Sequence, residues 1–350
     1  MIGSLDSIFL QKLTFTDETL STLKILGEYK GKQTLFTQQT PEVLNTLLQV
    51  SMIESSESSN RIEGITAPHN RIAAIIQNKT QPKNRSEQEI AGYRDALALI
   101  HQSAKHMTLT ENVILQCHQM LYRYLHEEGG SWKMVDNDIV EKSKNGEIIR
   151  IRFKPVSAVN TPQAMKDLVE NYKTAIHVNQ QEPLVVIPLL ILDFLCIHPF
   201  TDGNGRTVRL LTLMLLYHFG YEVGRYISLE RIFEESKETY YETLEESSKN
   251  WHESKHNVHP WLRYFWGTLV RAYEEFEKRV GSIRKGKGSK TDQIRHAVTH
   301  KIATFTISDI EKECPGVSRE TIRKALRQLR DEGNIKSIGT GRGAKWIKIP

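Results

Sequence analysis

The sequence has little cysteine and no long uninterrupted apolar run. Its cysteines, Cys117, Cys196 and Cys314, lie far apart, which argues against a disulfide framework and a CxxC metal site. The longest apolar stretch, residues 184–197, is shorter than a membrane span and contains a proline and an aspartate, so no transmembrane helix is expected. The N-terminus lacks the basic start and the small-residue cleavage site of a secretory signal. These absences favour a cytoplasmic protein.

The remaining composition is that of a globular protein of about two domains. The 350 residues are 25% charged and 39% hydrophobic, which excludes a largely disordered or fibrous chain. The net charge of +5 is unevenly distributed, because residues 281–350 carry sixteen Lys/Arg and only seven Asp/Glu. A basic C-terminal quarter on a mildly acidic body favours a separate module with nucleic acid as one candidate partner.

Helical periodicity dominates the first 280 residues, with one interruption. Residues 138–153 contain two β-branched runs around Lys144-Asn145-Gly146, and Asn-Gly in that context predicts a β-hairpin. The sequence therefore predicts a mainly α fold with a small hairpin. The expected regions are a helical N-terminal region at 1–85, a core at 86–280, a basic linker at 281–290 and a C-terminal module at 291–350.

The C-terminal module has the element order of a winged helix-turn-helix. Three helical segments are followed by two short extended pieces around a glycine-rich turn. Its third helix carries Arg319, Arg323, Lys324, Arg327 and Arg330, and the wing carries Arg342 and Lys345. This pattern is typical of DNA binding, and a module for protein contacts is the alternative.

One segment, His198-Pro-Phe-Thr-Asp-Gly-Asn-Gly-Arg-Thr-Val-Arg209, concentrates the residues that can perform chemistry. It joins two apolar helices through a glycine-rich loop, and such a loop offers backbone N–H groups to an anion. Arg206 and Arg209 are three residues apart on the second helix and could hold successive phosphates.

Two further side chains of this loop complete a candidate site. Asp202 provides a hard oxygen ligand suited to Mg²⁺ between phosphates. His198 is the group that titrates near neutral pH and is the natural general base. The loop is thus suited to bind a nucleoside triphosphate with Mg²⁺ and to deprotonate a nucleophile.

This segment matches in full the HxFx[D/E]GNGRxxR motif, and the chain resembles Fic-domain proteins over about residues 40–280. The resemblance implies AMP transfer from ATP to a Ser, Thr or Tyr hydroxyl of a protein, with His198 as base and Asp202 holding Mg²⁺. It also implies a nucleotide site formed by the motif and by a tyrosine pair that borders the adenine and ribose. Those nucleotide-binding residues are Asp202, Gly203, Asn204, Gly205, Arg206, Thr207, Arg209, Tyr240 and Tyr241.

The resemblance assigns two further segments. The hairpin would be a flap that docks the target by strand addition through Arg150, Ile151, Arg152 and Phe153. The sequence Ser59-Asn-Arg-Ile-Glu63-Gly64 matches the inhibitory pattern [S/T]xxxE[G/N] of Fic relatives. Glu63 would pair with Arg209 and keep it from the γ-phosphate, while Ser59 would form a local bond that steadies its helix.

Two other interpretations remain open. Glu63 could serve the reverse reaction, removal of AMP, and the chain could instead be a DNA-binding regulator that senses nucleotide. The family also allows self-modification and homodimers. His118 is predicted to be a packed core histidine, and His252, His256 and His259 are predicted to lie in a solvated loop rather than to bind a metal. Adenine contacts within 248–259 cannot be assigned from the sequence.

Overall fold

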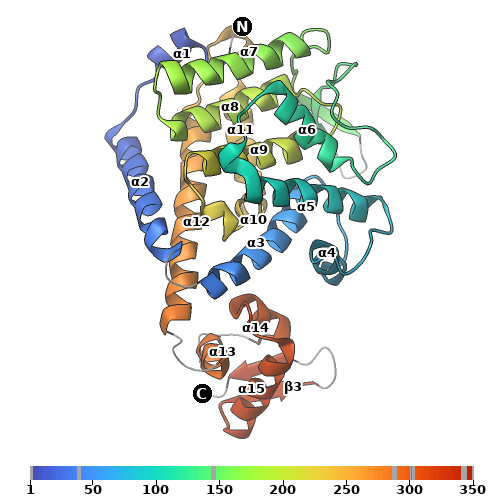
Figure 1. The fold of residues 1–350 in the computed structure, drawn as a ribbon, viewed down its shortest axis with the longest axis vertical. Helices are drawn as coiled ribbons and strands as arrows, with labels where there is room; N and C mark the ends of the chain where they lie inside the picture. The colour runs from blue at the N-terminus through green and yellow to red at the C-terminus, as the bar shows by residue number, and fades with distance from the viewer. Residues whose placement is uncertain are drawn as a thin grey trace. The chain divides into compact units, whose positions relative to one another are not determined.

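The computed structural model of the protein describes residues 3–37, 41–142, 147–285, 290–299, 301, 304–339 and 345–348. Within these ranges the chain is mainly helical, with two small antiparallel strand pairs (Figure 1). This confirms the predicted fold class. In the part of the chain that is described, no helix is both long and apolar enough to span a membrane.

Two compact units divide the chain. The first contains residues 1–34 and 51–273, and the second contains residues 35–50 and 274–350. Most of the N-terminal region predicted over 1–85 therefore belongs to the same unit as the core. Helix α3 (Pro41–Ile62) is shared, because its first half belongs to the second unit and its second half to the first.

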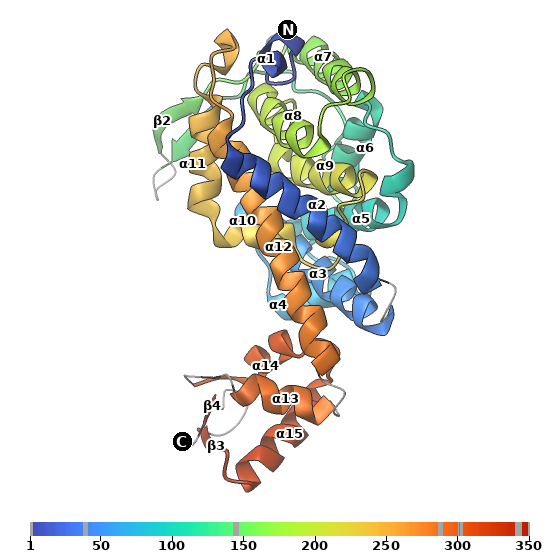
Figure 2. The ribbon, with the colours of Figure 1, turned by 90° about the vertical axis from the view of Figure 1, so that its left-hand side faces the viewer.

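In the first unit, α8 and α9 are buried along most of their length. Besides α3, the helices of this unit are α1 Ser7–Gln11, α2 Asp17–Thr37, α4 His69–Ile76, α5 Arg85–Ser103, α6 Glu111–Leu121, α7 Thr161–Lys173, α8 Pro183–Ile197, α9 Asn204–His218, α10 Leu229–Glu235, α11 Lys237–Ser248 and α12 His259–Lys285. The residues of α2 from Leu35 and those of α12 from Glu274 belong to the second unit. Helices α2 and α12 lie side by side (Figures 1 and 2). Tyr29 of α2 stacks on Tyr273 of α12, with ring centroids 5.3 Å apart.

Helix α8 lies at the centre of this unit because its sequence is apolar on every side. Pro188 in its interior has no N–H, which leaves the carbonyl of Leu184 one turn earlier without its helical donor. The indole Nε1 of Trp266 on α12 donates to that carbonyl at 2.7 Å, and Trp261 Nε1 donates to the Pro188 carbonyl at 2.7 Å. Trp266 thus satisfies the carbonyl that the proline leaves without a donor, and Trp261 adds a second bond from α12 to the same helix.

One carboxylate, Asp193, is buried in α8 and accepts four hydrogen bonds. The donors are Ser4 N at 2.9 Å, Ser4 Oγ at 2.6 Å, Leu5 N at 3.1 Å and Trp251 Nε1 at 2.7 Å. Burial raises the pKa of Asp193, and these donors oppose that shift. The network also reaches His256, whose Nε2 is 2.9 Å from Ser4 Oγ. The N-terminal segment is therefore attached to the centre of the unit by polar contacts.

The second unit contains the C-terminal elements in the predicted order. These are α13 Lys290–Thr299, α14 Ile307–Glu313, α15 Arg319–Asp331 and the antiparallel strands β3 Ile335–Ile338 and β4 Lys345–Lys348. Their core includes Ile294, Phe305, Ile310, Ile322 and Trp346. The predicted linker begins later than expected, because α12 continues to Lys285, and residues 286–289 lie outside the described residues. Arg342 of the predicted wing also lies outside them.

Candidate active site

The loop between α8 and α9 contains the His198–Arg209 segment. His198 follows the end of α8 in the left-handed conformation, with φ 50°, and Gly203 takes φ 80° directly before α9 begins. Glycine adopts this conformation at little cost. The Asn204 side chain closes the loop, since its Oδ1 accepts from Phe200 N at 2.9 Å and its Nδ2 donates to Phe200 O at 2.7 Å. Helix α9 thus begins with a first turn whose N–H groups have no helical acceptors, as an anion site requires.

His198 is half-buried at the start of this loop. Its Nδ1 lies 3.3 Å from the carbonyl of Leu195, so Nδ1 carries the proton and Nε2 keeps a lone pair. Burial lowers the pKa of His198 to about 4, and the positive charge of Lys133 acts in the same direction. The imidazole is therefore neutral at pH 7 and able to accept a proton at Nε2.

Lys133 fixes the backbone on both sides of His198. Its backbone N donates to Pro199 O at 2.8 Å, and its Nζ donates to Ile197 O at 3.2 Å and to Asn137 Oδ1 at 2.8 Å. Burial lowers the pKa of Lys133 to about 8. Sequence analysis did not assign this role, because Lys133 lies more than sixty residues before the motif and in a segment without helical or strand pattern.

His118 on α6 supports the other end of the loop. Its Nδ1 accepts from Gly130 N at 2.8 Å, so its Nε2 donates to the Asp202 carbonyl at 3.0 Å. Its ring stacks on Phe200 with centroids 3.7 Å apart. Burial lowers the pKa of His118 to about 4. The histidine is packed as predicted, and in addition it positions the backbone of Asp202.

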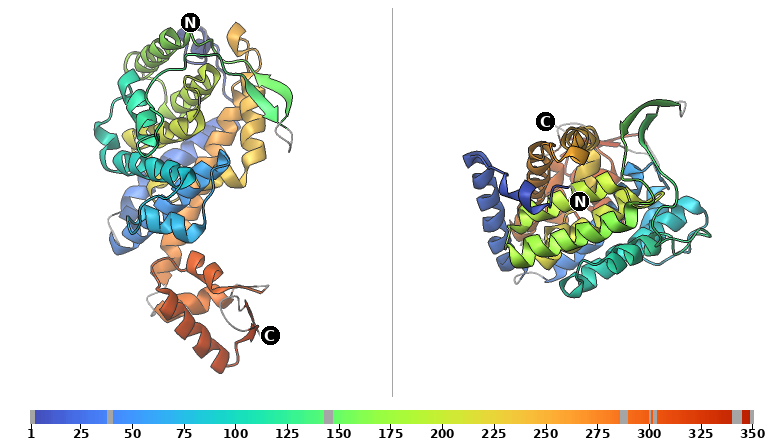
Figure 3. Two further views of the ribbon diagram at one scale, coloured as in Figure 1. Left: turned by 90° about the vertical axis from the view of Figure 1, so that its right-hand side faces the viewer. Right: turned by 90° about the horizontal axis from the view of Figure 1, so that it is seen from above.

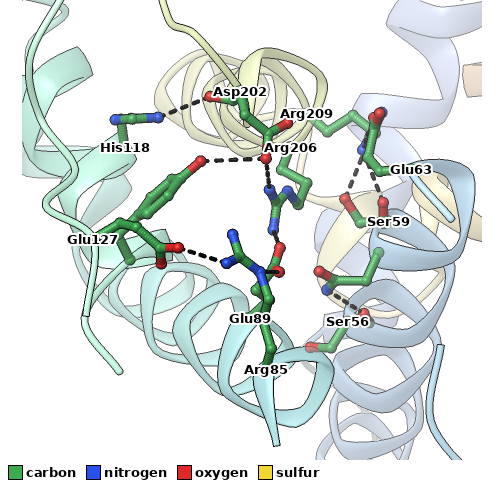
Figure 4. A network of polar contacts seen from close by, with 12 residues as sticks. Ser56, Ser59, Glu63, Arg85, Glu89, His118, Glu127, Asp202, Arg206 and Arg209 are labelled. Atoms are coloured by element: carbon green, nitrogen blue, oxygen red, sulfur yellow. Dashed lines mark hydrogen bonds and ion pairs between the residues drawn. The ribbon is translucent and has the colours of Figure 1, made fainter. Parts of the chain in front are cut away.

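Arg206 is buried on α9, with 1% of its side chain exposed, between two carboxylates. Its Nη1 forms a close ion pair with Glu89 of α5, and its Nη2 lies 3.3 Å from Asp202 Oδ2 (Figure 4). Asp202 is 66% exposed, whereas Glu89 is 7% exposed. The same oxygen of Asp202 accepts from Tyr122 OH at 3.4 Å. The contact with Glu89 was not predicted from the sequence.

Arg209 contacts the segment that matches the inhibitory pattern. Its Nη2 donates to Glu63 Oε1 at 2.7 Å and to Ser59 O at 2.8 Å, and its Nε donates to Ser59 Oγ at 2.9 Å (Figure 4). The predicted Glu63–Arg209 pair is therefore present. The hydroxyl of Ser59 thus has a contact with Arg209 that was not predicted, and its predicted local bond stays a prediction. Burial disfavours the charge of Arg209, but Glu63 together with Tyr240 and Tyr93 outweighs this effect, so the pKa of Arg209 is raised.

Two glycines allow Glu63 to reach this position. Gly64 has φ 82° and turns the chain away directly after Glu63, which follows the last residue of α3. Gly205 has no side chain in the place where Glu63 Oε1 lies, and an added Cβ there would also be 3.1 Å from Arg209 Nη1. Glycine at both positions is thus explained by the approach of the carboxylate to α9.

The second half of α3 packs largely through polar side chains. Its buried polar residues are Ser51, Ser55, Ser56, Ser58, Ser59 and Asn60, whereas Ile62 is its buried apolar residue and the partly buried Met52 and Ile53 pack against an apolar cluster. Ser51 Oγ donates to Gly224 O at 3.3 Å, and Ser55 Oγ donates to Glu230 Oε2 at 2.7 Å. This half of the helix that leads to Glu63 is therefore attached to the core by side-chain hydrogen bonds as well as by apolar contacts.

The tyrosine pair differs in burial. Tyr240 is 3% exposed and packs among Phe233, Tyr241, Trp261 and Tyr264, whereas Tyr241 is half-buried. Burial raises the pKa of Tyr241 to about 12, and the negative charge of Glu63 adds to this shift. Tyr241 is thus the member of the pair nearer to solvent and close to the charged site.

The part of the chain around this loop matches a known family. Residues 108–216, which run from α6 through the motif into α9, match the sequence profile of the Fic/DOC family. The chain carries a Fic domain. The match contains the hairpin, α8, the loop and most of α9, whereas Glu63, Glu89 and the tyrosine pair lie outside it.

Relatives of this Fic domain are found among curated proteins and solved structures. The protein adenylyltransferase Fic of Nematostella vectensis is 25% identical over 218 residues, 59% of this chain and 44% of that protein. The protein adenylyltransferase fic-1 of Caenorhabditis elegans is 33% identical over 75 residues, 20% of this chain and 14% of that protein. The matches thus span less than half of either relative.

The crystal structure of a Fic family protein from Desulfovibrio desulfuricans G20 extends the likeness to the fold. It superposes with a TM-score of 0.61 at 20% sequence identity and covers 96% of this chain and 97% of that chain. The helical core with a small hairpin is therefore a Fic-type fold.

The hairpin of the Fic domain is joined to α11 by an ion pair. Strand β1 (Ile139–Lys142) pairs with β2 (Ile148–Phe153), and the hairpin extends from the helical core in Figure 3. Arg150 bonds Glu141 at 2.8 Å and Glu245 of α11 at 2.7 Å, and Arg152 bonds Glu141 at 3.1 Å. The predicted turn Lys144-Asn145-Gly146 lies outside the described residues. Ile151 is exposed on β2, and Phe153 stacks on His252 with centroids 5.4 Å apart.

The donor set of the Fic domain fits a magnesium ion brought by a nucleotide. The described residues contain no cluster of three His, Cys, Asp or Glu side chains that could hold a metal. Asp202 instead offers one exposed carboxylate whose contacts are 3.3 and 3.4 Å long. Mg²⁺ commonly binds through one or two carboxylates together with substrate phosphates.

His256 lies in the loop that was predicted to be solvated. It is buried and its ring stacks on Phe9, so the prediction is wrong for this residue.

Proposed function

We propose that this chain is a protein adenylyltransferase that moves AMP from ATP to a Ser, Thr or Tyr hydroxyl of a protein. The observation that carries the proposal is a histidine whose Nδ1 lies against the Leu195 carbonyl, so that Nε2 keeps its lone pair, at the loop leading into α9, where Arg206 and Arg209 lie. The names of the two curated relatives support it. The target hydroxyl would be in an extended segment paired with the flap, or on this chain itself.

The reaction needs one proton acceptor and one site for phosphate charge. Nε2 of His198 takes the proton of the hydroxyl, and the hydroxyl oxygen forms a bond to the α-phosphorus. The bond from that phosphorus to the bridging oxygen of the β-phosphate breaks, and pyrophosphate leaves with the bond's electron pair. The N–H groups at Gly203 to Gly205 and the two arginines would stabilise the phosphate charge. Asp202 would hold Mg²⁺, which neutralises charge on the phosphates when bound.

Glu63 would act as a brake in this scheme. A carboxylate that occupies Arg209 Nη2 at 2.7 Å leaves that nitrogen unable to bind a phosphate. ATP would then bind in a pose in which the α-phosphorus is not aligned with the incoming hydroxyl. The resting protein is therefore expected to be largely self-inhibited.

The Glu63→Gly variant tests both parts of the proposal. Release of one charge-assisted contact at Arg209 is expected to raise AMP transfer by about 10–100-fold. The measurement uses the full chain with Mg²⁺ and ATP labelled at either the α- or the γ-phosphate, and protein-bound label is counted. Label from the α-phosphate alone is the expected result.

The Glu63→Gln variant is the matched control because it keeps the side-chain length and removes the charge. It is expected to activate less than Glu63→Gly, since its amide oxygen still accepts from Arg209. Protein-bound label from the γ-phosphate would show that the chain transfers a phosphoryl group and not AMP. If the unmodified chain removes AMP from a labelled target and Glu63→Gly does not, Glu63 serves the reverse reaction instead.

A second candidate function, DNA binding by the C-terminal unit, rests on the charges of α15. Arg323, Lys324 and Arg327 are exposed, and none has an acidic partner among the described residues. In contrast, Arg319 pairs with Glu311 at 3.0 Å and Arg330 with Asp331 at 2.8 Å. Unpaired cations on one exposed helix face are suited to phosphate contacts.

The Arg323→Ala/Arg327→Ala variant is expected to weaken binding of the full chain to duplex DNA. Loss of two phosphate contacts should reduce the slope of log K against log salt by about 2. Fluorescence anisotropy with a labelled duplex at several salt concentrations measures this slope. Lys166→Ala/Lys173→Ala removes the same charge from α7 and should leave the slope unchanged; an equal loss in both variants would show only a net-charge effect.

A further inference from the structure

The charges next to Asp202 form an alternating series that leads away from the loop. Asp202 contacts Arg206, Arg206 contacts Glu89, Glu89 Oε1 accepts from Arg85 Nε at 3.1 Å, and Arg85 pairs with Glu127 (Figure 4). Exposure changes along this series, since Arg85 and Glu127 are 59% and 53% exposed whereas Glu89 is 7% exposed. The inner pair is thus shielded from water and the outer pair is not.

Arg206 is a buried cation that requires a counter-ion. Only 1% of its side chain is exposed, and its Nε has no partner among the described residues. A buried guanidinium without a carboxylate is strongly disfavoured. Two carboxylates are within reach, and the close contact is made by the buried Glu89, whereas Asp202 stays 3.3 Å away and largely exposed.

We propose that Glu89 is a positioning residue that neutralises Arg206 and so keeps the carboxylate of Asp202 available for the Mg²⁺ that accompanies the nucleotide. Without Glu89, Asp202 is the carboxylate left to compensate Arg206, and a carboxylate committed to a guanidinium is a poorer metal ligand. The inference rests on the proposed nucleotide chemistry, and it concerns metal-dependent binding rather than the transfer step.

The test measures nucleotide affinity with and without metal. The parent is the full-length Glu63→Gly variant. The probe is α,β-methylene-ATP, in which a methylene group replaces the oxygen between the α- and β-phosphorus, so pyrophosphate cannot leave. Calorimetry gives the affinity in Mn²⁺ and in EDTA, and the ratio of the two reports the contribution of the metal. Glu89→Gln is expected to lower this ratio about tenfold, the effect of one lost charge-assisted contact. Glu127→Gln removes the same charge at the surface and should change the ratio less than about twofold.

A double-mutant cycle separates this role from a general field effect. Asp202→Asn should itself lower the ratio, and Glu89→Gln should then have no further effect, because it acts through Asp202. If the two substitutions lower the affinity ratio additively, Glu89 acts on the metal through its charge alone and not through Asp202. An unchanged ratio in Glu89→Gln would overturn the proposal outright.

Glu89→Gln/Arg206→Gln keeps the inference testable if the single variant does not fold. It removes both charges of the inner pair, so Asp202 is free again and the ratio should return toward that of the parent. A ratio as low as in Glu89→Gln would contradict the proposal. A parent that binds Mn²⁺ and nucleotide but transfers no AMP would refute the proposed function alone, whereas a parent whose affinity ignores Mn²⁺ would refute this inference even if AMP is transferred.

Discussion

His198→Ala is expected to lower AMP transfer by the Glu63→Gly protein about 10²–10⁴-fold, the usual contribution of a general base. The reason is that Nε2 of His198 is the proton acceptor in the proposed reaction, with the ring oriented by the Nδ1 bond to Leu195 O. Nucleotide affinity should change little, since the arginines and the N–H groups of α9 remain. Initial rates and calorimetry with the same preparations give both numbers.

A matched control lies at the other end of α9. His218 is an exposed histidine, and His218→Ala should leave the transfer rate within about twofold. The pH profile gives a second check, because kcat/KM reports the protonation of the free enzyme. With the pKa of His198 lowered to about 4 by burial, the base is already deprotonated at pH 6. The rate should therefore be nearly flat between pH 6 and 8 with respect to this group, and a rise centred on pH 6.5 would contradict the assigned environment.

Asp193→Ala is expected to lower the free energy of unfolding of the first unit by about 3–5 kcal/mol. The substitution leaves four buried donors, from Ser4, Leu5 and Trp251, without their acceptor. It also leaves a cavity at the place of the Asp193 side chain, which the neighbouring side chains cannot fill completely. Denaturant unfolding followed by tryptophan fluorescence is the measurement, because Trp251 itself contacts the carboxylate.

Asp193→Asn provides the graded comparison for this effect. Its amide oxygen can still accept hydrogen bonds, but its NH₂ group faces donors, so an intermediate loss is expected. Asp138→Ala, at an exposed position before β1, should change stability by no more than about 0.5 kcal/mol. A small effect of Asp193→Ala would mean that the N-terminal segment is held by its apolar contacts instead.

The sequence was sufficient for the parts of the site that are local in the chain. The motif loop between α8 and α9 is predicted from a glycine-rich break between two apolar helices. The contact of Glu63 with Arg209 is predicted from the resemblance to Fic relatives. The hairpin and the order of the C-terminal elements follow from turn residues and periodicity. In each case the residues that determine the structure are neighbours or are joined by a pattern of fixed spacing.

The parts that escaped prediction depend on contacts between distant segments. Glu89 and Arg206 are 117 residues apart, and nothing in the spacing of either helix marks them as a pair. Lys133 and Asp193 were missed for the same reason, because a lysine in a loop and an aspartate in an apolar helix acquire their roles only from the partners that packing brings to them. Ser59 was assigned a local bond for lack of any sign that Arg209 would reach it.

The polar packing of the second half of α3 has a thermodynamic consequence. Moving this half away from the core would expose the hydroxyl and amide groups of its buried serines and Asn60 together with the hydrocarbon of Ile62, Met52 and Ile53. Apolar exposure raises heat capacity and polar exposure lowers it, so the two contributions partly cancel in such a release. The enthalpy of release then changes less with temperature than it would for an apolar face. A van't Hoff plot of the balance between the braked and released forms would therefore be less curved than for a helix held by apolar contacts alone.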